Sequence, residues 1–252
     1  MKNETEMTLF DHLTELRSRL IWVFAIFVLS LGVGLYFAGP VIGHLKEQPI
    51  AEGVPLTSLA PSDVLGVYMQ FAFVIGMIVT LPVALFHVWR FVSPGLRPNE
   101  RRATLSFIPV AFFLFILGLS FGYYIVFPMV MGFMAQMNSY IGTNLMYGIA
   151  QYFSFMFNMV IPFGFLFELP IVVMFLTRLR ILNPVRLAKA RRFAYFGLAV
   201  IAIMLTPPDF ISDVLVTIPL LVLYEISVWL SRIVYRKQIK EDEEWEKVYT
   251  QE

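Results

Sequence analysis

One carboxylate lies inside a long apolar stretch of this chain. Glu168 is surrounded by aromatic and aliphatic residues in the segment PFGFLFELPIVVMF, residues 162–175, and Pro170 follows it by two positions. An ionised carboxylate in hydrocarbon costs about 2.5 kcal/mol or more, so an acid at such a place is a candidate functional group. Pro170 also frees a backbone carbonyl, which only protein or water can satisfy. The chemistry expected here is polar docking or proton transfer.

A second acid, Glu15, lies in the segment TLFDHLTELRSRL. Its leucines recur at spacings of three and four, which predicts an amphipathic helix over residues 1–19 that leads into the first apolar stretch. Two interpretations of Glu15 stay open. It pairs with Arg19 at the i,i+4 spacing, or it is held at the membrane surface and accepts a bidentate guanidinium from another chain.

A third acid, Glu100, stands in a basic segment, WRFVSPGLRPNERRATL, residues 89–105. Basic residues beside a membrane commonly fix topology and contact anionic lipid. Glu100 itself could simply begin the next helix near its positive end. Considered alone, the segment is explained by these structural roles, and a binding function is not required.

The sequence offers little for catalysis. The chain has no cysteine and three histidines, which fall on different loops or span ends, and the H-E-x-x-H, Walker A and G-x-S-x-G motifs are absent. We therefore expect no enzymatic activity, no metal and no cofactor.

Composition identifies the environment in which these acids must be held. Hydrophobic residues make up 58% of the 252 residues and charged residues 15%, whereas a soluble domain carries about 25% charged residues. We predict an all-α polytopic membrane protein forming one integral membrane domain with a charged tail at 231–252. Uncharged stretches near the length of a membrane span predict six transmembrane helices, at about 20–38, 67–89, 105–127, 152–176, 193–205 and 214–230.

The third and fourth spans come from one uncharged stretch, which we expect Pro128 and the polar residues 136–144 to divide. The last two spans are short. Basic residues gather on the side of the termini, and Lys46 is the exception, so the positive-inside rule predicts that both termini are cytoplasmic in a multi-pass protein of the cell membrane. No internal repeat is evident.

Taken together, these segments resemble the TatC family, the multispan subunit of the twin-arginine protein translocase. The resemblance covers almost the whole chain, in family order: HLTELRSRL, Pro49, FVSPGLRPNERR, FGYYIVFP, PFGFLFELP, LTPPDFISD and IPLLVLYEIS. The segment FLTRLRILNPVRLAKARRFAYF further resembles the version found in Gram-positive bacteria.

The resemblance implies a non-enzymatic receptor for folded precursor proteins that carry a signal peptide with paired arginines. Glu15 and Glu100 match the carboxylates that recognise these arginines. Phe91, Leu96, Arg17 and Arg102 match positions beside them. Two carboxylates can pair with two planar guanidinium groups in a way that lysine cannot copy.

The resemblance also implies a concave, glove-like bundle whose wall carries Glu168. There we expect Glu168 to be protonated or reached by water and to dock a partner helix or the signal peptide. A hydrogen-bonded acid that only joins helices is the structural alternative. Other matched positions have weaker expectations: Pro49 shapes an outer cap, Asp209 and Asp213 cap a helix start, and Glu225 pairs with Arg192 or Arg232.

Expected partners follow from the family: single-span TatA-type subunits, a TatB-like subunit where one exists, further copies of the chain and membrane lipid, without nucleic acid. No nucleotide motif occurs, so the energy for transport must come from outside the chain, and we expect the protonmotive force to supply it. A different class stays open, a proton-coupled small-solute transporter in which Glu168 carries the proton and Asp213 or Glu225 assists.

Overall fold

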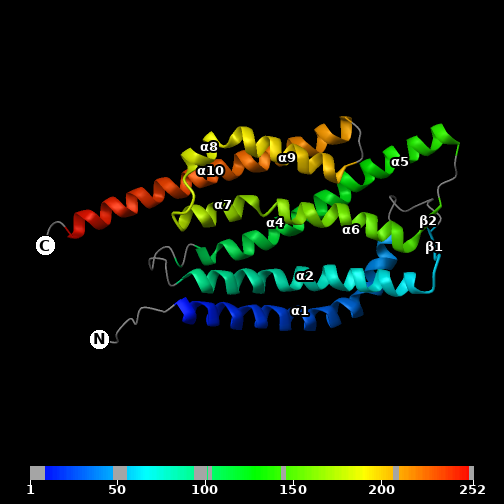
Figure 1. The fold of residues 1–252 in the computed structure, drawn as a ribbon, viewed down its shortest axis with the longest axis horizontal. Coiled ribbons are helices and arrows are strands. Elements are labelled where there is room, and N and C mark those ends of the chain that lie inside the picture. Colours follow the sequence, from blue (N-terminus) through cyan, green and yellow to red (C-terminus); the bar gives the residue numbers. More distant parts are fainter. Residues whose placement is uncertain are drawn as a thin grey trace. The chain divides into compact units, whose positions relative to one another are not determined.

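The computed structural model describes residues 9–47, 56–93, 101, 104–142, 146–206 and 210–249 (Figure 1). Within these ranges nearly every residue is helical. Five candidate residues lie outside them: Pro49, Leu96, Glu100, Arg102 and Asp209.

The first compact unit is a pair of long helices, α1 (Leu9–Lys46) and α2 (Ser62–Val92). Small residues let the two backbones approach closely, as is usual between helices in lipid. A side-chain carbon added to Gly34 would overlap the backbone of Ala72, 2.8 Å from its Cα. The predicted amphipathic helix and first span are thus one continuous helix.

The second unit contains Leu56–Thr57 and the described chain from Pro109 onward. Its first helical elements are α4 (Phe107–Phe121), of which Phe107 and Ile108 belong to the first unit, the π-helical turn η2 (Gly122–Val126) and α5 (Phe127–Ile141). Of the two features expected to divide the apolar stretch, the polar residues 136–144 do so, because α5 ends within them at Ile141, whereas the prediction for Pro128 is wrong. The helix passes through Pro128, which occupies the first turn of α5, and ends at Gly142 in the left-handed conformation. The π-helical turn immediately before Pro128 changes the hydrogen-bond register, so the missing N–H does not interrupt the helix.

The next apolar stretch forms α6 (Ile149–Leu166) and α7 (Leu169–Arg178), separated by a two-residue turn. Glycines again allow close packing, because a side-chain carbon on Gly118 of α4 would lie 2.9 Å from the Cα of Gly164. The strands β1 (Leu56–Thr57) and β2 (Tyr147–Gly148) pair in parallel next to the start of α6.

The chain continues with α8 (Pro184–Lys189), α9 (Arg191–Leu205) and the 40-residue α10 (Phe210–Tyr249). The charged tail prolongs α10 and packs on α7. There the Thr177 and Ser231 hydroxyls lie 2.7 Å apart, and Gln238 donates to the Arg178 carbonyl at 2.7 Å.

The architecture confirms the all-α polytopic class. In the described part of the chain, five stretches are long and apolar enough to cross a membrane: 14–46, 62–92, 107–141, 149–178 and 213–243. The predicted fifth span coincides with α9, which has only 15 residues. The count of six spans is compatible with this arrangement and stays a prediction, as do the glove-like shape and the cytoplasmic termini.

Candidate functional site

Glu15 and Arg19 form a small polar cluster on α1 with the end of α2. One guanidinium nitrogen of Arg19 pairs with Glu15 Oε1, and the other donates to the His87 carbonyl at 3.0 Å. The same guanidinium lies 6.0 Å from the ring centroid of Phe91, a cation–π distance. Three kinds of group therefore hold one arginine head: a carboxylate, a backbone carbonyl and an aromatic face.

The i,i+4 ion pair between Glu15 and Arg19, one of the two interpretations from the sequence, is present. It involves only one oxygen of the Glu15 carboxylate, Oε1. Oε2 of Glu15 is buried and has no hydrogen-bond partner within the ranges that the structure describes. The Glu15 side chain is 26% exposed and that of Arg19 13%. A buried acceptor without a donor costs about 1–3 kcal/mol, so Oε2 is an unsatisfied acceptor in this cluster.

Described residues that follow the Glu100 segment contact the end of α2. Trp89 Nε1 donates to Thr104 Oγ1 at 3.0 Å, and the Arg101 guanidinium lies 5.7 Å from the Trp89 ring. These contacts bring residues on both sides of 94–100 to the end of α2, two positions from Phe91. Glu100, Leu96 and Arg102 themselves are outside the described residues, and Arg17 is exposed on α1.

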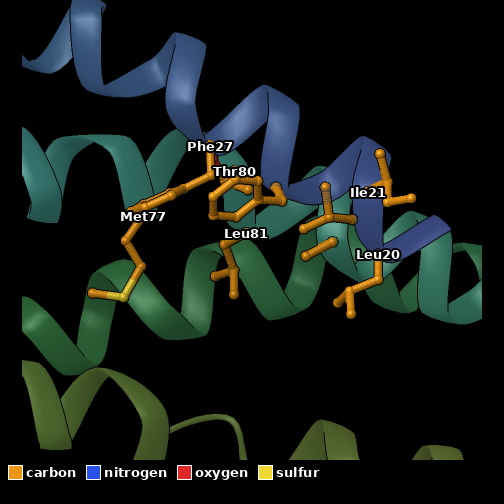
Figure 2. A pocket seen from close by; sticks show the side chains of 9 residues that line it. Leu20, Ile21, Phe27, Met77, Thr80 and Leu81 are labelled. Atoms are coloured by element: carbon orange, nitrogen blue, oxygen red, sulfur yellow. The ribbon is translucent and has the colours of Figure 1, made fainter. Parts of the chain in front are cut away.

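An apolar groove between α1 and α2 begins one residue beyond Arg19. Its volume is about 530 Å³. Figure 2 shows Leu20, Ile21 and Phe27 of α1 and Met77, Thr80 and Leu81 of α2 around it. The hydroxyl of Thr80 is buried and has no partner among the described residues. The groove can accept apolar side chains, and no residue pattern in the sequence predicted it.

Glu168 occupies the turn between α6 and α7. Its side chain is buried, and Oε1 has no hydrogen-bond partner in the described ranges. The backbone explains the turn: Phe167 N–H reaches the Phe163 carbonyl, Glu168 N–H reaches only the Phe165 carbonyl, and Pro170 has no N–H to give. An unpartnered oxygen weakens the interpretation of Glu168 as an acid that only joins helices.

The remaining acids serve the fold. Asp213 in the first turn of α10 accepts from the Thr206 hydroxyl at 2.6 Å and so links α9 to α10. Glu225 pairs with Arg191 at 2.8 Å and accepts from the Tyr195 hydroxyl. Pairing with an arginine is as expected, but the partner is Arg191, where the sequence suggested Arg192 or Arg232. The rotation of α9 about its axis decides between neighbouring arginines, and spacing alone does not fix it.

Comparison with known proteins agrees with this arrangement. The sequence model of one family, described as Sec-independent protein translocase protein (TatC), matches residues 11–219. The chain is 47% identical over 250 residues to the Sec-independent protein translocase protein TatC of Halalkalibacterium halodurans, covering 99% of both chains. It is 48% identical to TatCy of Bacillus subtilis, covering 93% of this chain and 92% of that one. A solved structure, "Crystal Structure of Twin Arginine Translocase Receptor- TatC in DDM", matches with a TM-score of 0.76 at 35% identity, covering 87% of this chain and 99% of that chain.

The protein has long apolar helices with a buried acid among them, and known proteins match it over nearly its whole length. These features define its class as the multispan subunits of protein translocases. The chain belongs to the TatC family of Sec-independent protein translocases. The resemblance seen in the sequence is thereby confirmed. The alternative of a proton-coupled solute transporter receives no support from these comparisons.

Proposed function

We propose that this chain is the receptor subunit of a twin-arginine translocase, that it has no catalytic activity, and that it binds the paired arginines of signal peptides at the Glu15 end of α1. The observation that carries the proposal is the cluster around Arg19. There a guanidinium is already held by Glu15, the His87 carbonyl and the Phe91 ring, while Glu15 Oε2 has no partner among the described residues. The cluster supports the chemistry because it accommodates one arginine head and contains a carboxylate oxygen that lacks a donor among the described residues.

The second carboxylate of the proposed site is Glu100. The Trp89–Thr104 hydrogen bond supports this role, because it brings the residues flanking the Glu100 segment to the end of α2 that carries Phe91. Arg17, Leu96 and Arg102 complete the proposed surface. Two carboxylates facing two guanidinium groups select arginine over lysine through planar, bidentate hydrogen bonds. The positive-inside distribution supports a cytoplasmic location for this surface.

The α1–α2 groove is the proposed place for the apolar stretch that follows the arginines. The groove starts at Leu20, directly after Arg19, so a peptide that engages Glu15 can continue along it without a break. Glu168 and the turn at Pro170 are the proposed intramembrane contact for a TatA-type subunit or the signal peptide. Assembly with TatA-type subunits, a TatB-like subunit and further copies of the chain, driven by the protonmotive force, completes the proposal.

Site-specific crosslinking of a twin-arginine precursor in membranes tests the receptor role. Replacing both Glu15 and Glu100 by alanine should abolish the crosslink. Asp242→Ala is the matched control, because Asp242 is also an ion-paired, partly exposed acid, and it should leave the crosslink unchanged. An undiminished crosslink in the double variant would refute the receptor site.

A second crosslinking experiment tests the groove separately. A photoreactive residue at Phe24, which lines the groove and is 66% exposed, should crosslink to the apolar part of the signal peptide. The same residue at Trp22, which lies at a similar depth, is 61% exposed and does not line the groove, should not. Equal crosslinking from both positions would contradict the groove assignment and leave the arginine site untouched.

A further inference from the structure

A second pocket, of about 430 Å³, lies between α8 and the charged half of α10. Pro184, Val185 and Ala188 of α8 form one wall. Arg232, Tyr235, Arg236 and Ile239 of α10 form the other. The pocket therefore combines two guanidinium groups and a phenol with an apolar surface.

The two arginines point away from the contacts between α10 and α7. Tyr235 and Arg236 lie three and four residues after Arg232, and Ile239 lies four and three residues after them, so the four share one face of the helix. Ser231 and Gln238 lie on another face and bind α7. The α8 wall of the pocket is held in place without the two arginines, because the Tyr224 hydroxyl donates to the Leu187 carbonyl at 2.9 Å. The two arginines are thus not needed for these contacts of α10 with α7 and α8.

The charges in the pocket are also uncompensated. Four other arginines form ion pairs within the described ranges: Arg19, Arg178, Arg180 and Arg191. Arg232 and Arg236 are exposed and form no ion pair with any described residue. Two unpaired guanidinium groups one helical turn apart can bind an anion with several oxygens, and phosphate suits their planar geometry.

The apolar neighbours identify which phosphate compound fits. Val185 is 56% exposed and Ile239 41%, and both line the pocket beside the arginines. Trp229, three residues before Arg232, is 60% exposed, and exposed tryptophan is typical of the membrane–water boundary. A free phosphate ion has no apolar group that could contact the exposed aliphatic side chains. A lipid has both a phosphate and an acyl chain.

We propose that the α8–α10 pocket binds an anionic phospholipid, with Arg232 and Arg236 on the head-group phosphate and Val185 and Ile239 against the start of an acyl chain. Tyr235 lies between the two arginines in sequence and can donate its hydroxyl to the same phosphate. The site rests on the membrane-spanning fold and is independent of the proposed signal-peptide surface.

Native mass spectrometry of the purified chain in dodecyl maltoside tests the assignment, with dioleoylphosphatidylglycerol and dioleoylphosphatidylcholine as probes. The wild type should retain one phosphatidylglycerol molecule in preference to phosphatidylcholine. The variant Arg232→Gln with Arg236→Gln should bind phosphatidylglycerol about 25-fold more weakly, roughly fivefold for each arginine near an anionic lipid. The matched control, Lys237→Gln with Lys240→Gln, removes two charges from the same helix outside the pocket and should stay within twofold of the wild type.

Three results would overturn the proposal. They are equal loss in the lysine control, unchanged binding in the arginine variant, and displacement of the lipid by millimolar inorganic phosphate, which would make the pocket a plain anion site. Thermal unfolding checks that the double arginine variant folds. If it does not, the single variants Arg232→Gln and Arg236→Gln replace it, and each should lose about fivefold. If neither single variant binds phosphatidylglycerol more weakly than the wild type, the proposed site is also refuted.

Discussion

Replacing Glu15 by glutamine isolates the charge of the proposed arginine site with little change of shape. The amide keeps one oxygen that can accept from Arg19, and the His87 carbonyl and the Phe91 ring still hold that guanidinium. What disappears is the negative charge, together with one of its two acceptor oxygens. The substitution should therefore affect a bound arginine of another chain more than it affects the fold.

The structure sets the size of both effects. A hydrogen bond to a charged group is worth about 1.5–3 kcal/mol, and the 26% exposure of the Glu15 side chain favours the lower end. We expect binding of a twin-arginine peptide to weaken by about tenfold to thirtyfold. The internal pair with Arg19 is a helical i,i+4 pair, so the free energy of unfolding should fall by less than about 1 kcal/mol.

Fluorescence anisotropy of a labelled twin-arginine signal peptide measures the binding, and thermal unfolding of the same samples measures stability. Arg19→Gln is an informative companion variant. It frees Glu15 Oε1 and removes a positive charge from the path of an incoming arginine, so binding should tighten by about twofold to fivefold. Asp242→Asn removes a partly exposed paired charge elsewhere and should change neither quantity appreciably.

Two results would refute the reasoning about Glu15. One is unchanged peptide affinity in Glu15→Gln. The other is a loss of affinity that appears only together with a large loss of stability, because Glu15 would then hold the helix ends together and bind nothing itself. Weaker binding in Arg19→Gln would show that Arg19 positions the site and does not compete for it.

Three further predictions concern the membrane part of the fold. Glu168→Gln should retain more protein export than Glu168→Leu, because the amide keeps a polar group in the turn; equal export by both variants and the wild type would make Glu168 dispensable. Gly34→Leu should lower the free energy of unfolding by about 1–3 kcal/mol through overlap with α2, whereas Gly32→Leu has open space and should be nearly neutral. Glu241→Ala leaves a buried guanidinium of α7 unpaired and should cost about 3 kcal/mol, against less than about 1 kcal/mol for the exposed pair lost in Asp242→Ala.

Local features of the fold could be predicted because local sequence determines them. Apolar length identified the long helices, and the shortness of α9 was visible in residues 193–205. From the spacing of Glu15 and Arg19, an ion pair between them was one of two interpretations. Glu168 stood out because an acid is rare in such a segment, and the structure finds its oxygen Oε1 without a partner among the described residues.

Features that depend on contacts between helices could not be predicted in this way. The choice of Arg191 as the partner of Glu225 requires the rotation of α9 against α10. The docking of the charged tail on α7 joins residues about 60 positions apart, Arg178 with Gln238. The helix continues through Pro128 because of the π-helical turn before it. No residue pattern in the sequence predicted that turn.

The central claim is that two carboxylates select paired arginines, and a comparison of two peptides against two proteins tests it most directly. Dissociation constants are measured for a signal peptide with paired arginines and for the same peptide with paired lysines, using the wild-type chain and the variant Glu15→Gln with Glu100→Gln. The account predicts that the wild type prefers arginine by about tenfold or more and that this preference disappears in the variant. A preference for arginine that persists at full size without both carboxylates would contradict the account.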